Sequence, residues 1–339
     1  MTSRPLALLA IVAPLLGGCA SFHRGAMPGE PKDATFAKVD GVRMRYVDHG
    51  SPTAPPVVLI HGFASALDSW NTVMPALEKA GYRVIAVDLK GFGWTDRPEG
   101  DYSPAAQAKL VYGLLDQRGV SKAAFVGHSW GSSVVLTAAM QKPDRVSRFA
   151  LYDAWVYEDQ LPTFFHWARA DGLGEMMFSL WYTERPDDKM ANAFYDKRYV
   201  TEKFVEEVEA ALERPGTVAA ALAAVRGQRY ADVESKYRTI DKPALLLWGR
   251  DDEVTTLRFG ERLASDLKQS KLVVYPACGH FPMIEAQASS TADLLAFLAP
   301  ELAAVPAAPV TPATAGTTTT PTTTPTNSDG IKRELPGDP

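Results

Sequence analysis

The regular alternation of short apolar runs with helical patterns constrains this 339-residue chain more than any other feature. The apolar runs cover residues 57–60, 83–87, 123–126, 149–152, 244–248 and 272–275, and the helical patterns lie near residues 67–79, 104–118, 131–142, 256–268 and 288–298. A hairpin over residues 36–39 and 42–47, turned at Asp40-Gly41, precedes them. Strand–helix alternation of this kind predicts an α/β fold, with a parallel sheet covered by helices on both faces.

One long segment, residues 154–237, interrupts this alternation. It has helical periodicity, contains no convincing buried strand, and is denser in aromatic residues than the 10% of the whole chain. We expect most of these rings to form a small helical core. The sequence also predicts a helical cap over a pocket, with a few rings lining an apolar substrate site.

The two ends of the chain differ in composition from the rest. Residues 1–18 have Arg4 as their one charge, followed by an apolar run at residues 6–16 that is too short to span a bilayer, which takes about 20 residues. This pattern predicts a secretory signal peptide. Residues 19–34 are polar and rich in Gly and Pro, which predicts a tether. Residues 301–339 are rich in Thr and Pro, which predicts a disordered tail.

The signal peptide ends in Leu16-Gly17-Gly18-Cys19, which resembles the lipobox of bacterial lipoproteins. The resemblance implies that Cys19 is acylated and becomes the first residue, so that the lipid bilayer is a partner of an exported, membrane-anchored protein. In bacteria with two membranes, the absence of Asp after Cys19 favours the outer membrane, facing the periplasm or the cell surface. The alternative is an ordinary signal peptide with an accidental cysteine.

Charge and cysteine content exclude some functions. The formal net charge is −5 and the basic residues do not cluster, so nucleic acid is not an expected partner.

The chain has two cysteines, and a lipidated Cys19 would leave Cys278 without a partner. An exported protein without a disulfide depends on its core for stability. We interpret Cys278 as a small buried residue.

The strongest catalytic signal is Gly127-His128-Ser129-Trp130-Gly131, which matches G-x-S-x-G. The motif directly follows a predicted strand and directly precedes a predicted helix, the context of a nucleophile elbow. In such a turn the residues beside the serine must be small, and the helix amino terminus faces the developing oxyanion. Ser129 is therefore the predicted nucleophile.

A serine nucleophile needs a base and an acid that orients the base. In proteins with a nucleophile elbow of this kind, the acid and then the histidine follow the serine along the chain. His280 is the one histidine beyond His166, so it is the predicted base. Asp251 and Asp252 follow the strand that ends at residue 248, and the residues alone leave both open as the acid.

Two backbone N–H groups are expected to bind the oxyanion. The residue after the nucleophile, Trp130, supplies one, and Phe63, in the loop after an earlier strand, supplies the other. We interpret His61 in that loop as a scaffold group rather than a base. Gly91-Phe92-Gly93 lacks the third glycine of a dinucleotide fingerprint, so we interpret it as a structural turn fixed by Asp96 and Arg97.

These motifs together, over residues 36–300, resemble the capped branch of the α/β-hydrolase superfamily. The resemblance implies an eight-stranded, mostly parallel sheet with a core at residues 35–153 and 238–300 and a cap at residues 154–237. It also places the acid three residues after the strand-end glycine, Gly249, which selects Asp252 over Asp251. It implies neither a metal nor an organic cofactor.

The expected activity is hydrolysis of a carboxylic ester or related acyl compound, an apolar small-molecule substrate, through an acyl-Ser129 intermediate. Epoxide hydrolases and haloalkane dehalogenases of this branch carry Asp at the nucleophile position. Ser129 attacking an alkyl carbon would leave an ether that water does not cleave. Carbon–carbon bond hydrolases, with a similar Cys278-Gly279-His280 block, and prolyl aminopeptidases remain alternatives. A non-catalytic, ligand-binding lipoprotein is an alternative from another class.

Overall fold

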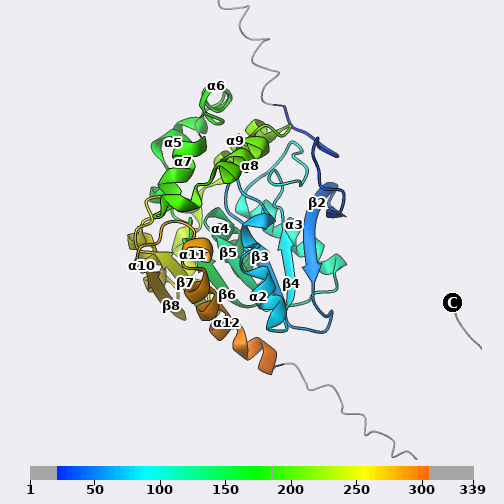
Figure 1. Ribbon diagram of the computed structural model, residues 1–339, viewed down its shortest axis with the longest axis vertical. Helices are drawn as coiled ribbons and strands as arrows, with labels where there is room; N and C mark the ends of the chain where they lie inside the picture. Colours follow the sequence, from blue (N-terminus) through cyan, green and yellow to red (C-terminus); the bar gives the residue numbers. More distant parts are fainter. Residues whose placement is uncertain (1–20, 185, 305–339) are drawn as a thin grey trace, which may run out of the picture. The chain divides into compact units, whose positions relative to one another are not determined.

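An eight-stranded sheet runs through the part of the chain that the computed structural model describes, residues 21–184 and 186–304 (Figure 1). Its strands are β1 (Thr35–Val39), β2 (Val42–His49), β3 (Pro56–Ile60), β4 (Arg83–Val87), β5 (Ala123–His128), β6 (Val146–Tyr152), β7 (Ala244–Gly249) and β8 (Ser270–Tyr275). Their order is β1-β2-β4-β3-β5-β6-β7-β8. All pairs from β4 to β8 are parallel, whereas β2 is antiparallel to both neighbours. The predicted mostly parallel eight-stranded sheet is confirmed.

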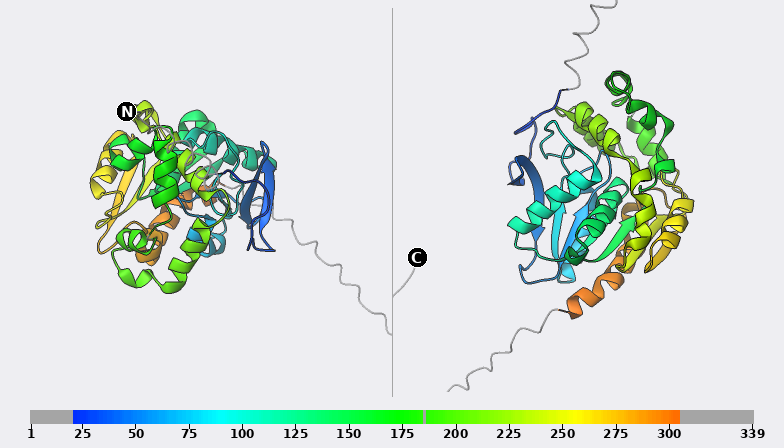
Figure 2. Two further views of the ribbon diagram at one scale, coloured as in Figure 1. Left: turned by 90° about the horizontal axis from the view of Figure 1, so that it is seen from above. Right: turned by 180° about the vertical axis from the view of Figure 1, so that it is seen from behind.

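Strands β3 and β7 are apolar along their whole length because both faces of the sheet are covered. In β3, Val58 and Ile60 pack into one core cluster and Val57 and Leu59 into the other, as the two-residue period of a strand requires. One face is covered by α3 (Pro104–Gln117), α4 (Trp130–Gln141) and α10 (Leu257–Asp266), and the other by α2 (Met74–Lys79), α11 (Pro282–Glu285) and α12 (Gln287–Ala303). Figure 1 shows α2, α11 and α12 in front of the sheet, and the rear view in Figure 2 shows α3 and α4.

Two helices differ from their predicted bounds. The helix expected at residues 67–79 is divided into a 3-10 helix, η1 (Leu67–Trp70), and α2, because Pro75 has no backbone N–H with which to continue a helix. At the other end of the chain, α12 includes residues 301–303, which we predicted as the start of the tail. Residues 305–339 of that tail, the signal peptide at residues 1–18 and Cys19 lie outside the described residues.

Residues 21–34, predicted as part of a tether, are packed against the loop after β4. His23 and Arg97 exchange backbone hydrogen bonds of 2.8 and 2.9 Å, and the buried guanidinium of Arg97 donates to Met27 Sδ and to the Gly93 carbonyl. The Asp96 carboxylate accepts hydrogen bonds from the backbone N–H groups of residues 25 and 43. Asp96 and Arg97 therefore fix this loop as predicted, and they also hold the amino-terminal segment.

The segment between β6 and β7 contains helices and no strand in its described residues. Its helices are α5 (Thr163–Ala168), α6 (Leu173–Trp181), α7 (Pro186–Ala193), α8 (Glu202–Leu212) and α9 (Thr217–Gly227), with the short 3-10 helices η3 (Glu158–Gln160), η4 (Lys197–Tyr199), η5 (Tyr230–Asp232) and η6 (Glu234–Thr239); a further one, η2 (Pro143–Arg145), precedes β6. Helices α5–α9 are drawn in green in Figure 1. In the described ranges, no helix has both the length and the apolar character needed to cross a membrane.

Candidate active site

The predicted site residues all follow strands of the parallel part of the sheet. Phe63 follows β3, Ser129 follows β5, Asp252 follows β7 and His280 follows β8. Because parallel strands end at the same edge, this topology brings the four loops together at the carboxyl edge of the sheet, where open α/β sheets bind ligands.

Ser129 occupies a strained backbone conformation between β5 and α4. Its φ is +50°, a region that costs a non-glycine residue about 1–3 kcal/mol. Three backbone hydrogen bonds hold it: its N–H donates to the Tyr152 carbonyl at 2.9 Å, and its carbonyl accepts from Ser132 at 2.9 Å and from Trp155 at 3.1 Å. The turn has the geometry expected of a nucleophile elbow.

The two motif glycines leave no room for a side chain. A Cβ at Gly131 would lie 2.4 Å from the His61 carbonyl oxygen, and a Cβ at Gly127 would lie 2.9 Å from the Ser132 Cα. Both distances are shorter than real Cβ contacts allow. The glycines of G-x-S-x-G are therefore needed for the close approach of β5, α4 and the loop after β3.

His280 and Asp252 form a buried pair. The Nδ1 atom of His280 lies 2.8 Å from Asp252 Oδ2, and both side chains are buried. The Thr255 hydroxyl donates to Asp252 Oδ2 at 2.6 Å, and the backbone N–H groups of Val254 and Thr255 donate to Oδ1. Burial acts to raise the pKa of Asp252, but the charge of His280 and these hydrogen bonds outweigh it, so the pKa is lowered.

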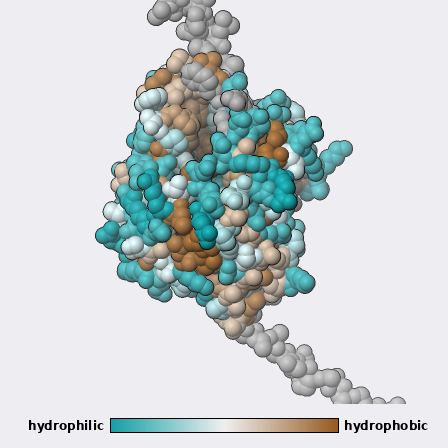
Figure 3. All heavy atoms as spheres, turned by 60° about the vertical axis from the view of Figure 1, so that its left-hand side comes forward, coloured by the Kyte–Doolittle hydropathy of each residue, from teal (hydrophilic) through white to brown (hydrophobic). Residues whose placement is uncertain are grey.

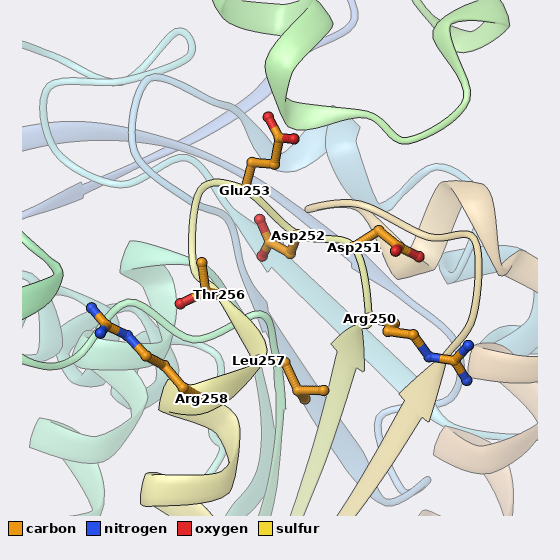
Figure 4. A pocket seen from close by; sticks show the side chains of 7 residues that line it. All are labelled: Arg250, Asp251, Asp252, Glu253, Thr256, Leu257 and Arg258. Atoms are coloured by element: carbon orange, nitrogen blue, oxygen red, sulfur yellow. The ribbon is translucent and has the colours of Figure 1, made fainter.

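Asp251 lies outside this pair. It is exposed, and Figure 4 shows its carboxylate and that of Asp252 pointing in opposite directions from the loop after β7. The surface pocket drawn there is lined by Arg250, Asp251, Asp252, Glu253, Thr256, Leu257 and Arg258, a set that does not include Ser129 or His280. The geometry thus distinguishes two carboxylates that the residues alone left open, and it pairs Asp252 with His280.

His128 ties the His280 loop to the elbow, a contact that the sequence analysis did not foresee. Its Nε2 donates to the His280 carbonyl at 2.8 Å, and the centroids of the two rings are 4.8 Å apart. Burial lowers the pKa of His128 to about 3, so its ring is neutral. Within the described chain no hydrogen bond joins Ser129 to His280.

The loop after β3 lies directly against Ser129. A Cβ at Gly62 would be 3.0 Å from the Ser129 Cβ, so Gly62 allows the backbone of this loop to approach Ser129. Among the described residues, the backbone N–H groups of Phe63 and Trp130 have no hydrogen-bond partner. Two free donors next to a serine hydroxyl are what an oxyanion site requires.

His61 has the structural position that we predicted for it. Its Nδ1 lies 2.7 Å from the Gly62 carbonyl and its Nε2 accepts from the Leu89 N–H at 3.0 Å, so both ring nitrogens are occupied. Burial lowers the pKa of this ring and keeps it neutral. His61 therefore orders the loop that carries Phe63.

Aromatic side chains surround the two free donors. The Phe63 ring contacts the rings of Phe92, Trp130, Phe165 and Tyr182, with centroids 5.4–6.3 Å apart. Phe165 belongs to α5 and Tyr182 follows α6, so these two helices cover this part of the site. The wall beside Ser129 is apolar and comes partly from the segment predicted as the cap.

Asp153 is a buried carboxyl that the sequence analysis missed. Its φ is +42°, its Oδ1 accepts from the Gly249 N–H at 2.9 Å, and its Oδ2 has no partner within the described residues. Burial, with the nearby charge of Asp252, raises the pKa of Asp153 well above its ordinary value. Its place directly after β6, at the same edge as the other site residues, is the sequence signal that could have identified it.

Asp153, Asp252 and His280 also form the one group in the described chain with the spacing of metal ligands. One oxygen of each carboxyl and one ring nitrogen lie within 4.8 Å of one another. However, the His280–Asp252 hydrogen bond already engages two of these side chains, and burial raises the pKa of Asp153, which disfavours the ionised carboxylate that binds a metal ion.

Comparison with known proteins agrees with the observed fold. Residues 55–287 match the family model described as the alpha/beta hydrolase fold, and the chain belongs to that family. It is 32% identical over 251 residues to a 2-hydroxy-6-oxo-2,4-heptadienoate hydrolase of Pseudomonas putida, covering 70% of this chain and 86% of the relative. It is 43% identical over 113 residues to epoxide hydrolase A of Mycobacterium tuberculosis, covering 33% and 35% of the two chains.

A solved structure is similar over most of the chain. The meta-cleavage product hydrolase of Pseudomonas fluorescens IP01 is 27% identical, with a TM-score of 0.66, and the match covers 78% of this chain and 97% of that one. Together with the family match, this likeness identifies the protein as a hydrolase of the α/β-hydrolase fold.

Proposed function

We propose that this hydrolase cleaves a carboxylic ester or related acyl compound through an acyl-Ser129 intermediate. The observation that carries the proposal is the buried His280–Asp252 hydrogen bond of 2.8 Å at the sheet edge where Ser129 forms its strained elbow. Nucleophile, base and orienting acid are the three groups that acyl transfer by a serine requires.

The reaction follows from the positions of these groups. Ser129 Oγ attacks the acyl carbon while His280 Nε2 takes the hydroxyl proton, and Asp252 holds the Nδ1–H and stabilises the imidazolium. The free N–H groups of Phe63 and Trp130 donate to the oxyanion. Collapse of the intermediate releases the alcohol with the proton from His280. Water then attacks acyl-Ser129 by the same steps and releases the acid.

The aromatic wall supports an apolar, uncharged acyl substrate. The uncharged rings of Trp130 and Phe165 pack against Phe63, whose loop approaches Ser129. The serine also argues against epoxide opening, although two relatives are named for it, because attack on an alkyl carbon would leave a stable ether at Ser129. A carbonyl substrate gives an acyl-serine that water can cleave.

A fluorophosphonate probe tests this proposal. We expect intact-mass analysis to show one adduct on wild type, on the peptide that contains Ser129, and none on Ser129→Ala. The matched control is Ser132→Ala, which removes the same atom three residues away, from a hydroxyl that has no hydrogen-bond partner in the described chain. Labelling of Ser129→Ala, or none of wild type, would contradict the proposed nucleophile.

Carbon–carbon bond hydrolysis is the second candidate, favoured by the 32% identity to 2-hydroxy-6-oxo-2,4-heptadienoate hydrolase. The two candidates differ in substrate charge, since that relative is named for a carboxylate. Comparing kcat/KM for neutral esters of increasing acyl length with kcat/KM for that dienoate separates them. A kcat/KM for the dienoate about 100-fold or more above that for the esters would replace the ester proposal. Loss of both activities in Ser129→Ala would show that both reactions use the same site.

We also propose that the mature protein is anchored in a membrane through acylated Cys19. Two or more acyl chains hold a protein firmly on a bilayer, whereas one binds only marginally. The lipobox-like Leu16-Gly17-Gly18-Cys19 supports the proposal. Wild type is expected to enter the detergent phase on phase separation, and mass spectrometry is expected to find a triacylated Cys19 as the first residue. An unmodified first residue at any other position would exclude the anchor.

A further inference from the structure

The outer faces of α5 and α6 form an exposed apolar surface, which we call the α5–α6 patch. Its members are Phe164, Trp167, Leu173, Met176 and Leu180, exposed by 39–58%. They fall at i and i+3 on α5 and at i, i+3 and i+7 on α6, so each helix turns one continuous apolar face to solvent. Figure 3 shows hydrophobic surface at the upper end of the molecule, where α6 lies in Figure 1.

The opposite faces of the same helices are apolar as well. Phe165 and Ala168 of α5 and Phe178 of α6 are buried, and a Cβ at Gly174 would lie 2.2 Å from the Ala168 carbonyl oxygen, so the helices pack closely. A helix that is apolar on all sides is normally covered on all sides. An exposed patch of this kind marks an interaction surface.

Charge indicates what kind of surface would cover the patch. Glu175 is the one Asp, Glu, Lys or Arg residue in α5 and α6, and both its oxygens accept hydrogen bonds from Arg226 of α9 at 2.7 and 2.9 Å. Asp171, fully exposed between the two helices, also lies 3.5 Å from Arg226, so the patch offers no unpaired basic side chain to an anionic partner. A tryptophan among aliphatic side chains without basic residues suits the interface of a neutral bilayer.

The amino-terminal segment lies near the patch. Gly216, the N-cap of α9, is in contact with His23, since a Cβ there would be 2.9 Å from the His23 nitrogen. Arg226, in the last turn of α9, is bonded to α6, and the 11 residues of this helix span about 16 Å. From His23 back to Cys19 is four residues, a reach of at most about 14 Å.

We infer that the α5–α6 patch is a second membrane contact, which lies in the bilayer interface when Cys19 is anchored there. The inference rests on the proposed anchor. The same two helices carry Phe165 and lead into Tyr182, which contact Phe63 beside Ser129. The patch would therefore place the apolar wall of the site next to lipid, where an apolar ester is concentrated.

Quenching of tryptophan fluorescence by brominated phosphatidylcholine tests the contact in the mature, lipidated protein bound to vesicles. Wild type is expected to be quenched, and Trp167→Phe, which keeps an apolar ring, is expected to lose most of that quenching. Trp94→Phe is the matched control, because the Trp94 ring is covered by Arg214, 3.6 Å from its centroid. Adding phosphatidylglycerol should not increase the quenching, because the arginines next to the patch, Arg169 and Arg226, are already paired with carboxylates.

The outcomes separate the patch from the anchor. Vesicle-bound protein with the same quenching in wild type and Trp167→Phe would overturn the patch proposal and leave the anchor standing. Protein that does not bind vesicles at all would overturn both. A third outcome is that wild type is not quenched and is dimeric in detergent, whereas the triple variant Trp167→Ser/Met176→Ser/Leu180→Ser is monomeric. This would show that a second copy of the chain covers the patch instead.

Activity provides an independent measurement. The triple variant should lose about 10-fold or more activity towards a long-chain ester dissolved in vesicles, and keep its activity towards a short, water-soluble ester within about twofold. Its fluorophosphonate labelling of Ser129 should be unchanged, which would show that the fold and the nucleophile are intact. Equal losses on both esters would contradict a role in membrane contact.

Discussion

The carboxyl edge of the sheet and the α5–α6 helix pair meet at Phe63, but they are built differently. At the edge, the Asp252 carboxylate accepts hydrogen bonds from three groups of residues 254 and 255 and also pairs with His280. The helix pair is apolar on both faces and leaves five large side chains exposed. The first arrangement fixes atoms for chemistry, and the second provides adaptable apolar surface. We therefore expect edge variants to change the rate of reaction and helix variants to change which substrates react.

Ser129→Ala should give the largest effect. Removing the serine nucleophile of a hydrolase that works by serine, histidine and aspartate lowers kcat by about 10⁶. We expect that loss on every ester, with unchanged thermal unfolding, because the change deletes one atom. Ser132→Ala should stay close to wild type in kcat. If Ser129→Ala kept more than a few per cent of activity, the chemistry would not reside at the elbow.

Asp252→Asn should give the second-largest effect. An amide at this position favours the wrong tautomer of His280, which costs about 10⁴ in kcat. Asp251→Asn, the neighbouring change on an exposed side chain, should remain within a few-fold of wild type. Steady-state kinetics on one neutral ester measures both. A larger loss in Asp251→Asn than in Asp252→Asn would assign the acid to Asp251 and would show that the buried Asp252–His280 pair is not needed for the reaction.

The sequence was sufficient to predict the strands and the turn at Ser129, because both depend on the pattern of neighbouring residues. Continuous apolar runs mark the central strands, and a serine between glycines at a strand–helix boundary marks a tight turn. The choice between Asp251 and Asp252 required a family spacing, since two adjacent carboxylates have the same local signal. The structure separates them by direction, with one buried against His280 and one exposed.

Other parts of the site could not be predicted because their partners are distant in sequence. Asp153 meets Gly249 and His128 meets His280 only once the strands are placed side by side. The segment at residues 21–34 has the composition of a tether, but its order comes from Asp96 and Arg97, about 70 residues further along the chain. Amino-acid composition indicates how flexible a segment is by itself. It gives no information about contacts with charged side chains, such as Asp96 and Arg97, that are distant in sequence.

Phe165→Leu should separate the roles of the two regions. Phe165 is buried in the ring cluster beside Phe63, and replacing it removes aromatic contact while keeping an apolar side chain. We expect the ratio of kcat/KM between long and short acyl esters to change by about 10-fold, the scale of small apolar differences in a pocket. Phe164→Leu, on the adjacent ring that is 44% exposed, should leave that ratio unchanged for soluble esters. Equal effects on all esters would mean that α5 supports the chemistry rather than selecting substrate.

Asp153→Asn should give the smallest catalytic effect and a measurable change in stability. The pKa of Asp153 in the folded protein is raised well above its ordinary value, mainly by burial, so the folded state keeps a proton that the unfolded chain releases above about pH 4. Stability from this residue is therefore lost as pH rises from about 4 towards the folded pKa. Asparagine has no proton to release and is as neutral as the protonated acid.

Asp153→Asn should accordingly unfold at a higher temperature than wild type at pH 8, by about 2–4 °C for each kcal/mol gained. The difference should shrink as the pH approaches 4, and kcat should stay within about threefold of wild type. Asp251→Asn, which is exposed, should show no such pH-dependent difference. A variant that is less stable than wild type at pH 8 but equal at pH 4 would show that Asp153 is ionised in the folded protein. The edge of the sheet would then hold two negative charges beside His280 rather than one.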